Sequence, residues 1–340
     1  MDWKAFYGEI KKGTVRNVYL FTGQEEYTKE NALKQLEKAL LPEGMELLNS
    51  ATYENAPAQQ IIEACETLPL LCEKRLVVVK DYAPLLSGKA KDEANEAERL
   101  SNWLQNPPQS CCLVFFVRGD ADARKKLTAQ LTKMGANVRF DALSESQISK
   151  WIARSLRPYG KTMDAAAENR LVFMAGRSLT SLEGELQKLL SYVGDRSAIT
   201  ENDVAKLVTP QTEYTVFQMI DRAMAGDSAG AHRLLKSSLE RGESRIGIIA
   251  MLTRQMRLLT HISFMKQAGA RLPEIEKRLE LTRYVASLAE RQANRFAPER
   301  AKAGYEACVA ADYAVKTGRA RDEQALDSLM LLLPSLATRT

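Results

Sequence analysis

The 340-residue sequence predicts an α/β domain with a mostly parallel sheet, followed by all-helical regions. Three observations lead to this prediction. Near-continuous apolar runs in the first part, such as RLVVVKD and CLVFFV, are typical of strands covered on both faces. These runs alternate with segments of helical periodicity, which favours parallel strands joined by crossover helices. After about residue 140 only the helical periodicity remains.

The first region, residues 1–140, alternates strands and helices. Its apolar runs predict strands at 18–21, about 47–53, 76–79, 113–117 and 138–140. Apolar residues spaced three and four apart predict helices at 3–10, 28–40, 57–67, 93–105 and 123–133. We expect this region to form one domain.

The helical part divides further at about residue 210. Residues 141–210 predict helices at 145–156, 165–175, 179–192 and 201–208, and Thr200 is the expected N-cap of the last. Residues 211–340 predict helices at 215–225, 228–241, 245–267, 272–280, 283–295, 298–317 and 323–334. Short glycine-containing loops favour antiparallel neighbours. We expect a small lid-like module over 141–210 and a separate helical domain over 211–340.

Composition bounds the function classes. The net charge is +5, and the whole excess lies after residue 210, so nucleic-acid contact is allowed but not required. The five cysteines include no C-x-x-C pair, and the two histidines, His232 and His261, lie far from them. We therefore expect a reduced protein without a metal site. No segment has the length of a signal peptide core or a membrane span, which predicts a cytoplasmic protein.

The segment NVYLFTGQEEYTKENALKQLEKAL is a strand, a turn at Gly23 and a helix, which is the scaffold of a phosphate-binding loop. That loop would read G-x-x-x-x-G-K-[ST]. Here the second glycine and the Lys-Ser/Thr pair are missing, and Glu25 and Glu26 stand where backbone amides would meet phosphate. The scaffold indicates a P-loop NTPase fold, whereas the residues argue against ATP binding.

Two other segments bear on nucleotide chemistry. Gly160-Lys161-Thr162 is a literal G-K-T, but it lacks the first glycine of the motif and follows a helix, so we expect a turn between helices. The strand at 113–117 is followed by Arg118, where an ATPase would need a carboxylate to hold Mg²⁺. Asp120 and Asp122 come later and are expected to cap the next helix.

The candidate binding residues are Leu68, Pro69, Leu70 and Leu71, which connect a helix to the strand RLVVV. Pro69 ends the helix and fixes a turn. The adjacent leucines have two open interpretations: they fold back into the core, or they form an exposed apolar plug for a partner's pocket. Fully burying one leucine is worth about 1.5–3 kcal/mol, so two leucines would make a strong contact.

Several basic residues are weaker candidates. Arg124, Lys125 and Lys126 follow the CLVFFV strand and either meet phosphates or form a solvated helix face, which we favour. A surface basic face is also the favoured interpretation of Arg254, Arg257 and Lys266. The remaining basic candidates, Lys316, Arg319 and Arg321, flank a helix end, where cations interact well with the helix dipole.

The order and spacing of several segments together resemble the delta-subunit family of the bacterial DNA polymerase III clamp loader, over nearly the whole chain. The segments are VYLFTGQEEY, ETLPLLCEKRLVVVKD, LVFFVRGDADARKKL, SLEGELQKLLSYV with ITENDV, VFQMIDRAMAGD, LTRQMRLL and ACVAADYAVKTG. The resemblance implies an AAA+-like domain (1–140), a helical lid (141–210) and a helical collar for oligomerisation (211–340). These boundaries coincide with the three regions above.

The resemblance also implies a function. Delta subunits bind the beta sliding clamp, hold one ring interface open and assemble with delta-prime and tau/gamma, and tau/gamma hydrolyses the ATP. No catalytic site, cofactor or metal is then expected in this chain, although it would be part of a DNA-directed DNA polymerase holoenzyme, a nucleotidyltransferase. Primer–template DNA would be met only within the complex. The clamp-contacting pair of the family falls on Leu70 and Leu71, and Leu71 replaces a residue that is usually aromatic.

Two alternatives come from other classes. The first is an active P-loop ATPase with an irregular loop, such as a helicase loader or initiator, which would bind ATP. The second is a DNA-binding module that uses the basic last third, whose affinity for DNA would fall steeply with salt.

Overall fold

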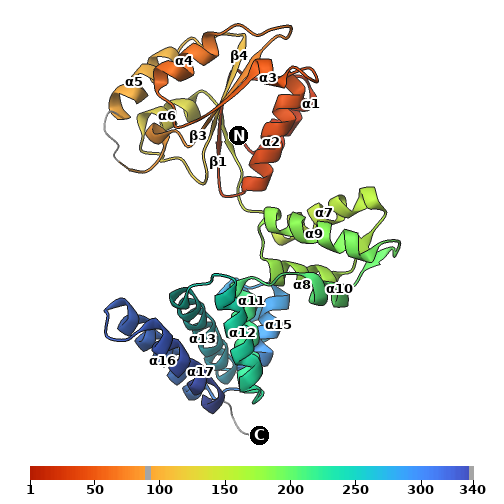
Figure 1. Ribbon diagram of the computed structural model, residues 1–340, viewed down its shortest axis with the longest axis vertical. Helices are drawn as coiled ribbons and strands as arrows, with labels where there is room; N and C mark the ends of the chain where they lie inside the picture. Colours follow the sequence, from red (N-terminus) through yellow and green to blue (C-terminus); the bar gives the residue numbers. More distant parts are fainter. Residues whose placement is uncertain (89–92, 337–340) are drawn as a thin grey trace. The chain divides into compact units, whose positions relative to one another are not determined.

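The computed structural model describes residues 1–88 and 93–336, and the chain forms two compact units (Figure 1). The first unit comprises Met1–Ile152 and Ser178–Glu183, and the second comprises Ala153–Arg177 and Gly184–Thr340. The predicted fold class, an α/β region followed by helices, is confirmed. The finer division into three domains at residues 140 and 210 stays a prediction.

The first unit is built on a five-stranded sheet in the order β2-β3-β4-β1-β5, and every pairing is parallel, as expected. Its strands are β1 (Val18–Thr22), β2 (Ser50–Glu54), β3 (Arg75–Lys80), β4 (Cys111–Phe116) and β5 (Asn137–Arg139). All residues of β1 and β4 are buried, because helices cover both faces of these central strands.

Helices lie on both sides of this sheet, α1 and α2 on one side and α4, α5 and α6 on the other (Figure 1). The helical segments are α1 (Trp3–Lys11), α2 (Glu26–Leu40), α3 (Glu46–Asn49), α4 (Ala58–Glu66), the 3₁₀ turn η1 (Ala83–Leu85), α5 (Glu93–Trp103) and α6 (Lys126–Lys133). Phe6 and Leu36 pack on the first face with Phe21, and Ile61, Leu100 and Leu127 fill the second. The side chains of each strand alternate between these two cores.

Three local predictions for this unit are wrong. The strand expected at about 47–53 begins only at Ser50, because residues 46–49 form the short helix α3. The helix expected from residue 123 begins at Lys126, and Asp122 does not cap it. Instead the Asp122 carboxylate accepts a hydrogen bond from the backbone N–H of Arg124 and pairs with its guanidinium. Asp120 pairs with Arg139 rather than capping a helix.

The next helices are α7 (Glu145–Leu156), α8 (Ala165–Ala175), α9 (Leu179–Val193) and α10 (Glu201–Leu207). Thr200 caps α10 as predicted, in a reciprocal pair with Asp203. We expected no strand in residues 141–210, and this prediction is wrong. The strands β6 (Thr162–Met163) and β7 (Ala198–Ile199) form a short parallel pair. The G-K-T segment leads into β6: Gly160 has φ +63° after the 3₁₀ turn η2 (Arg157–Tyr159), and Lys161 Nζ bonds two carbonyl oxygens.

The rest of the second unit is helical. It contains α11 (Thr212–Met224), α12 (Ser228–Glu240), α13 (Arg245–Gln267), α14 (Leu272–Leu279), α15 (Arg283–Ala293), α16 (Pro298–Lys316), α17 (Asp322–Leu332) and the 3₁₀ turn η3 (Leu333–Leu336). The long helix α13 packs along α16, and its apolar residues lie at the centre of one core with those of α11 and α17. Within the described residues, no helix is both long enough and apolar enough to cross a membrane.

Candidate functional site

The leucine loop, Leu68–Leu71, runs from the end of α4 to β3 and is exposed. Leu68, Leu70 and Leu71 are 78%, 53% and 76% exposed, and Pro69 is half-buried. The interpretation in which these leucines fold back into the core is therefore wrong for this structure. Exposed apolar side chains on neighbouring positions are the usual mark of a protein-binding site.

A buried asparagine holds this loop in place. Asn49, the last residue of α3, is fully buried, and its side-chain Oδ1 accepts a hydrogen bond of 2.6 Å from the backbone N–H of Leu70. The Asn49 side-chain amide nitrogen donates to the carbonyl oxygen of Leu70 at 2.9 Å, and also to that of Met45. Both backbone groups of Leu70 are thus paired, so the loop is anchored at its centre.

The backbone of the loop adopts an unfavourable conformation at Leu71. This residue has φ +58°, in the left-handed region that a β-carbon disfavours by about 1–2 kcal/mol. Such conformations persist only where the surroundings impose them, and they concentrate at functional sites. The hydrogen bonds to Leu70 next to it are one such constraint.

The turn after β1, where a P-loop would bind phosphate, is closed by the protein's own groups. The N–H of Gly23 donates to the carbonyl oxygen of Gly119 at 2.8 Å, and the N–H of Glu25 donates to that of Phe140 at 3.1 Å. Gly23 has φ +106°, and a β-carbon there would overlap the Phe140 carbonyl. Burial raises the pKa of the Glu25 carboxyl.

One lysine fills the space behind this turn. Lys29 in α2 has no exposed side-chain surface, and its Nζ lies 2.7 Å from Glu26 Oε1 and 2.6 Å from the carbonyl oxygen of Val117. It also lies over the ring of Phe116. The Glu26 carboxylate in turn accepts a bond from the N–H of Gly119. The ammonium group thus ties α2 to the end of β4.

The end of β4 carries a cation rather than a metal-binding carboxylate. Arg118 pairs with Glu54 at 2.9 Å and with Asp81 at 2.8 Å. Among the residues that the structure describes, no group of three or more His, Cys, Asp or Glu could hold a metal ion. Cys111 and Cys112 are buried, and neither forms a disulfide bond in the structure.

The basic candidates after β4 are partly neutralised. Arg124 pairs with Asp122 at 2.7 Å, and Lys125 pairs with Glu93 at 2.7 Å, while Lys126 is exposed. Contact of these residues with phosphate or DNA stays a prediction.

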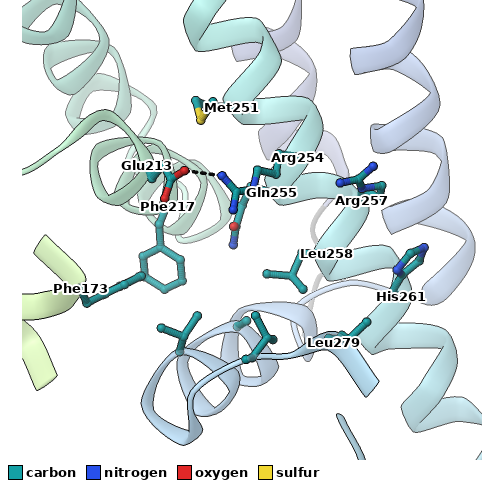
Figure 2. A pocket seen from close by; sticks show the side chains of 13 residues that line it. Phe173, Glu213, Phe217, Met251, Arg254, Gln255, Arg257, Leu258, His261 and Leu279 are labelled. Atoms are coloured by element: carbon teal, nitrogen blue, oxygen red, sulfur yellow. Dashed lines mark hydrogen bonds and ion pairs between the residues drawn. The ribbon is translucent and has the colours of Figure 1, made fainter. Parts of the chain in front are cut away.

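A cavity of about 400 Å³ lies in the second unit, between side chains of α8, α11, α13, α14 and α15 (Figure 2). Phe173 and Phe217 line it, and Arg254, Arg257 and His261 lie along one side. Arg254 is paired with Glu213.

The other basic candidates of the second unit interact locally. Lys266 pairs with Glu290 at 2.9 Å, and Lys316 pairs with Asp312 at 2.7 Å. The guanidinium of Arg319 lies 5.4 Å from the ring centre of Tyr313. Arg321 is the N-cap of α17 and contributes no side-chain capping bond.

Sequence reasoning missed Asn49, Lys29 and the two exposed leucines of α3. Leu47 and Leu48 lay in a predicted strand, and their exposure follows from α3, a four-residue helix with no periodic signal. The role of Asn49 depends on a contact 21 residues away in the sequence. The only sequence hint for Lys29 is its place in the turn segment.

Comparisons with known proteins give the same family for the N-terminal and the C-terminal part of the chain. A family model described as "DNA polymerase III, delta subunit" matches residues 19–141, and one described as "DNA polymerase III delta subunit, C-terminal domain" matches residues 213–333. The chain is 28% identical over 334 residues to a DNA polymerase III subunit delta of Bacillus subtilis, covering 97% of this chain and 95% of that protein. It is 22% identical to a probable DNA polymerase III subunit delta of Aquifex aeolicus, over 58% of this chain and 57% of that one.

A solved structure is similar over the full length. The DNA clamp loader delta protein of Bacillus subtilis superposes with a TM-score of 0.56 at 26% identity, covering 98% of this chain and 99% of that chain. This similarity agrees with the predicted AAA+-like class of the sheet-containing unit and with the helices that follow it.

Proposed function

Because this chain belongs to the DNA polymerase III delta-subunit family of clamp-loader proteins, we propose that it binds the beta sliding clamp and opens its ring for loading onto primed DNA. In this proposal Leu70 and Leu71 are the main contacts, with Leu68 and Pro69 in the same loop. The observation that carries the proposal is the exposed leucine loop, anchored by the buried Asn49. A pre-formed loop binds with less loss of conformational entropy than a flexible one.

We also propose that this chain opens the clamp without hydrolysing ATP. Two amides of the turn after β1 are already bonded to protein carbonyls, and Glu25 and Glu26 bring negative charge to it. Lys29 is engaged with Glu26 and Val117 rather than free to meet a phosphate. The ATP would act through tau/gamma, and delta-prime, tau/gamma and primer–template DNA are proposed partners in a complex that works in the cytoplasm.

Ring opening then follows from differential affinity. A closed clamp is in equilibrium with a rarely open form, and a ligand that fits the open form better shifts the balance by the ratio of its two affinities. The leucine loop would supply the affinity. The rigid α/β unit behind it would supply the preference for the open form.

A titration of the full-length chain with the cognate sliding clamp tests the proposal. Changing Leu70→Ala together with Leu71→Ala removes two apolar anchors, and we expect a loss of about 3 kcal/mol, roughly a hundredfold in Kd. Leu331→Ala is the matched control, because Leu331 in α17 is also strongly exposed. Binding that is unchanged in the double variant would falsify the leucine contact.

The nucleotide part has its own test. Wild-type chain and clamp should bind equally well with and without Mg-ATP, and the chain alone should show no heat of ATP binding in calorimetry. Saturable ATP binding at physiological concentration would favour the active P-loop ATPase instead.

A further inference from the structure

Two more exposed leucines lie in the segment that anchors the leucine loop. Leu47 and Leu48 of α3 are 96% and 52% exposed. They directly precede Asn49, whose side chain bonds both backbone groups of Leu70. Two segments 21 residues apart in the sequence are therefore held side by side, and each presents leucines to solvent.

The arrangement has costs that folding alone does not explain. Asn49 is a fully buried polar residue, and two of its three side-chain hydrogen bonds reach a surface loop rather than another core element. Leu71 keeps a left-handed backbone. Five leucines of the two segments stay in contact with water. A rigid apolar surface of this kind gains its stabilisation when a partner covers it.

We propose that Leu47 and Leu48 belong to the same partner-contacting surface as Leu70 and Leu71, and that Asn49 is the positioning residue that joins the two segments. The partner is the sliding clamp, so this inference rests on the proposed function. Its side of the contact would be an apolar pocket wide enough to take leucines from both segments. The sliding clamp is the expected partner because Asn49 holds Leu47 and Leu48 next to the leucine loop, which is the proposed clamp contact.

The first experiment measures clamp affinity of the full-length chain with Leu47→Ala and Leu48→Ala combined. We expect Kd to rise about tenfold, because the clamp would cover both leucines only in part, and truncating them removes that contact. Leu331→Ala again serves as the control and should stay within about twofold of wild type. Leu47 is 96% exposed and Leu48 is 52% exposed, so the double variant should fold, and circular dichroism checks this before Kd is measured.

The second experiment separates positioning from mere stability. Asn49→Ala should raise the clamp Kd about tenfold in the wild-type background, at a temperature where circular dichroism shows a folded chain. In the Leu70→Ala, Leu71→Ala background the same change should raise Kd by a smaller factor, because two of the leucines that Asn49 positions are already removed. A purely structural Asn49 would lower the melting temperature and leave Kd unchanged in both backgrounds.

The outcomes distinguish this inference from the proposed function. Unchanged affinity of the Leu47, Leu48 variant overturns the inference, even if Leu70 and Leu71 prove essential. Unchanged affinity of the Leu70, Leu71 variant removes the proposed contact itself. If Asn49→Ala fails to fold, the Leu47, Leu48 variant still decides the extent of the surface.

Discussion

We call Leu47, Leu48 and the leucine loop together the leucine surface. This surface and the turn after β1 lie in the same unit, but the groups of the turn are bonded within the protein, whereas the side chains of the surface are exposed. In the turn, the amides of Gly23 and Glu25 and the ammonium of Lys29 are bonded to protein groups. On the leucine surface, apolar side chains remain in water while the backbone beneath them is fixed by Asn49. The polar groups of the turn are hydrogen-bonded within the chain, whereas the apolar side chains of the leucine surface remain available to a partner.

The difference shows how a fold can keep its scaffold and change its function. A phosphate site needs amides and cations that are free to meet an anion, so pairing them internally removes the activity without changing the strand–turn–helix path. A docking surface needs the reverse: apolar groups held in position and left uncovered. Both changes concern single contacts rather than the arrangement of the sheet.

The largest expected effect is at Gly23, whose conformation closes the turn. Gly23→Ala would place a methyl group against the Phe140 carbonyl at φ +106°, and we expect a loss of more than about 3 kcal/mol in the free energy of unfolding in urea. Gly13→Ala is the matched control, because Gly13 also has a positive φ but open space around it, and it should lose only about 1 kcal/mol. Equal losses would mean that the turn can open.

Lys29 should come next, because its ammonium is buried and doubly bonded. Lys29→Ala leaves a cavity and an unpaired Val117 carbonyl, and we expect about 2–4 kcal/mol of destabilisation in urea unfolding. Lys29→Met keeps most of the stem, so it should lose less.

The control on the same helix is Lys34→Ala, since Lys34 is exposed and should change stability by less than about 0.5 kcal/mol. If Lys29→Ala matched this control, the ion pair with Glu26 would not stabilise the turn, and Lys29 would be available for a ligand.

The two regions also differ in how far the sequence predicts them. The turn was predicted because a phosphate loop has a fixed pattern, and departures from it are visible residue by residue. The sequence identified Leu70 and Leu71 as candidate binding residues. It did not predict that they are exposed, because exposure depends on whether the loop folds inward. The bond between Asn49 and Leu70 is a tertiary contact between residues without a local pattern, and periodicity cannot predict it. The short helix α3 was missed because apolar residues at 47 and 48 suit a strand equally well.

Leu71 gives a smaller effect that tests whether the surface is kept for binding rather than stability. Leu71→Gly and Leu71→Ala remove the same exposed side chain, but only glycine adopts φ +58° without a steric penalty. We expect the glycine variant to be about 1 kcal/mol more stable than the alanine variant in urea unfolding. Both should bind the clamp more weakly than wild type. Equal stability would indicate that the loop relaxes when the leucine is removed.

The smallest effect is the pH dependence that Glu25 gives to the closed turn. Burial raises the pKa of this carboxyl, so the folded state holds the proton more tightly than the unfolded state does. Its contribution to stability is therefore fully present below the unfolded pKa and is lost as pH rises through the higher folded pKa. Glu25→Gln should stabilise the chain at neutral pH, by less than the difference at Leu71, and this gain should vanish as the solution is acidified below the ordinary range of a glutamate. Glu30→Gln, at an exposed position in α2, is the matched control for the loss of a carboxylate and should change the free energy of unfolding by less than about 0.5 kcal/mol. A gain that persisted at low pH would mean that shape rather than charge makes Glu25 unfavourable, and the charge repulsion expected between this turn and a phosphate would lose its support.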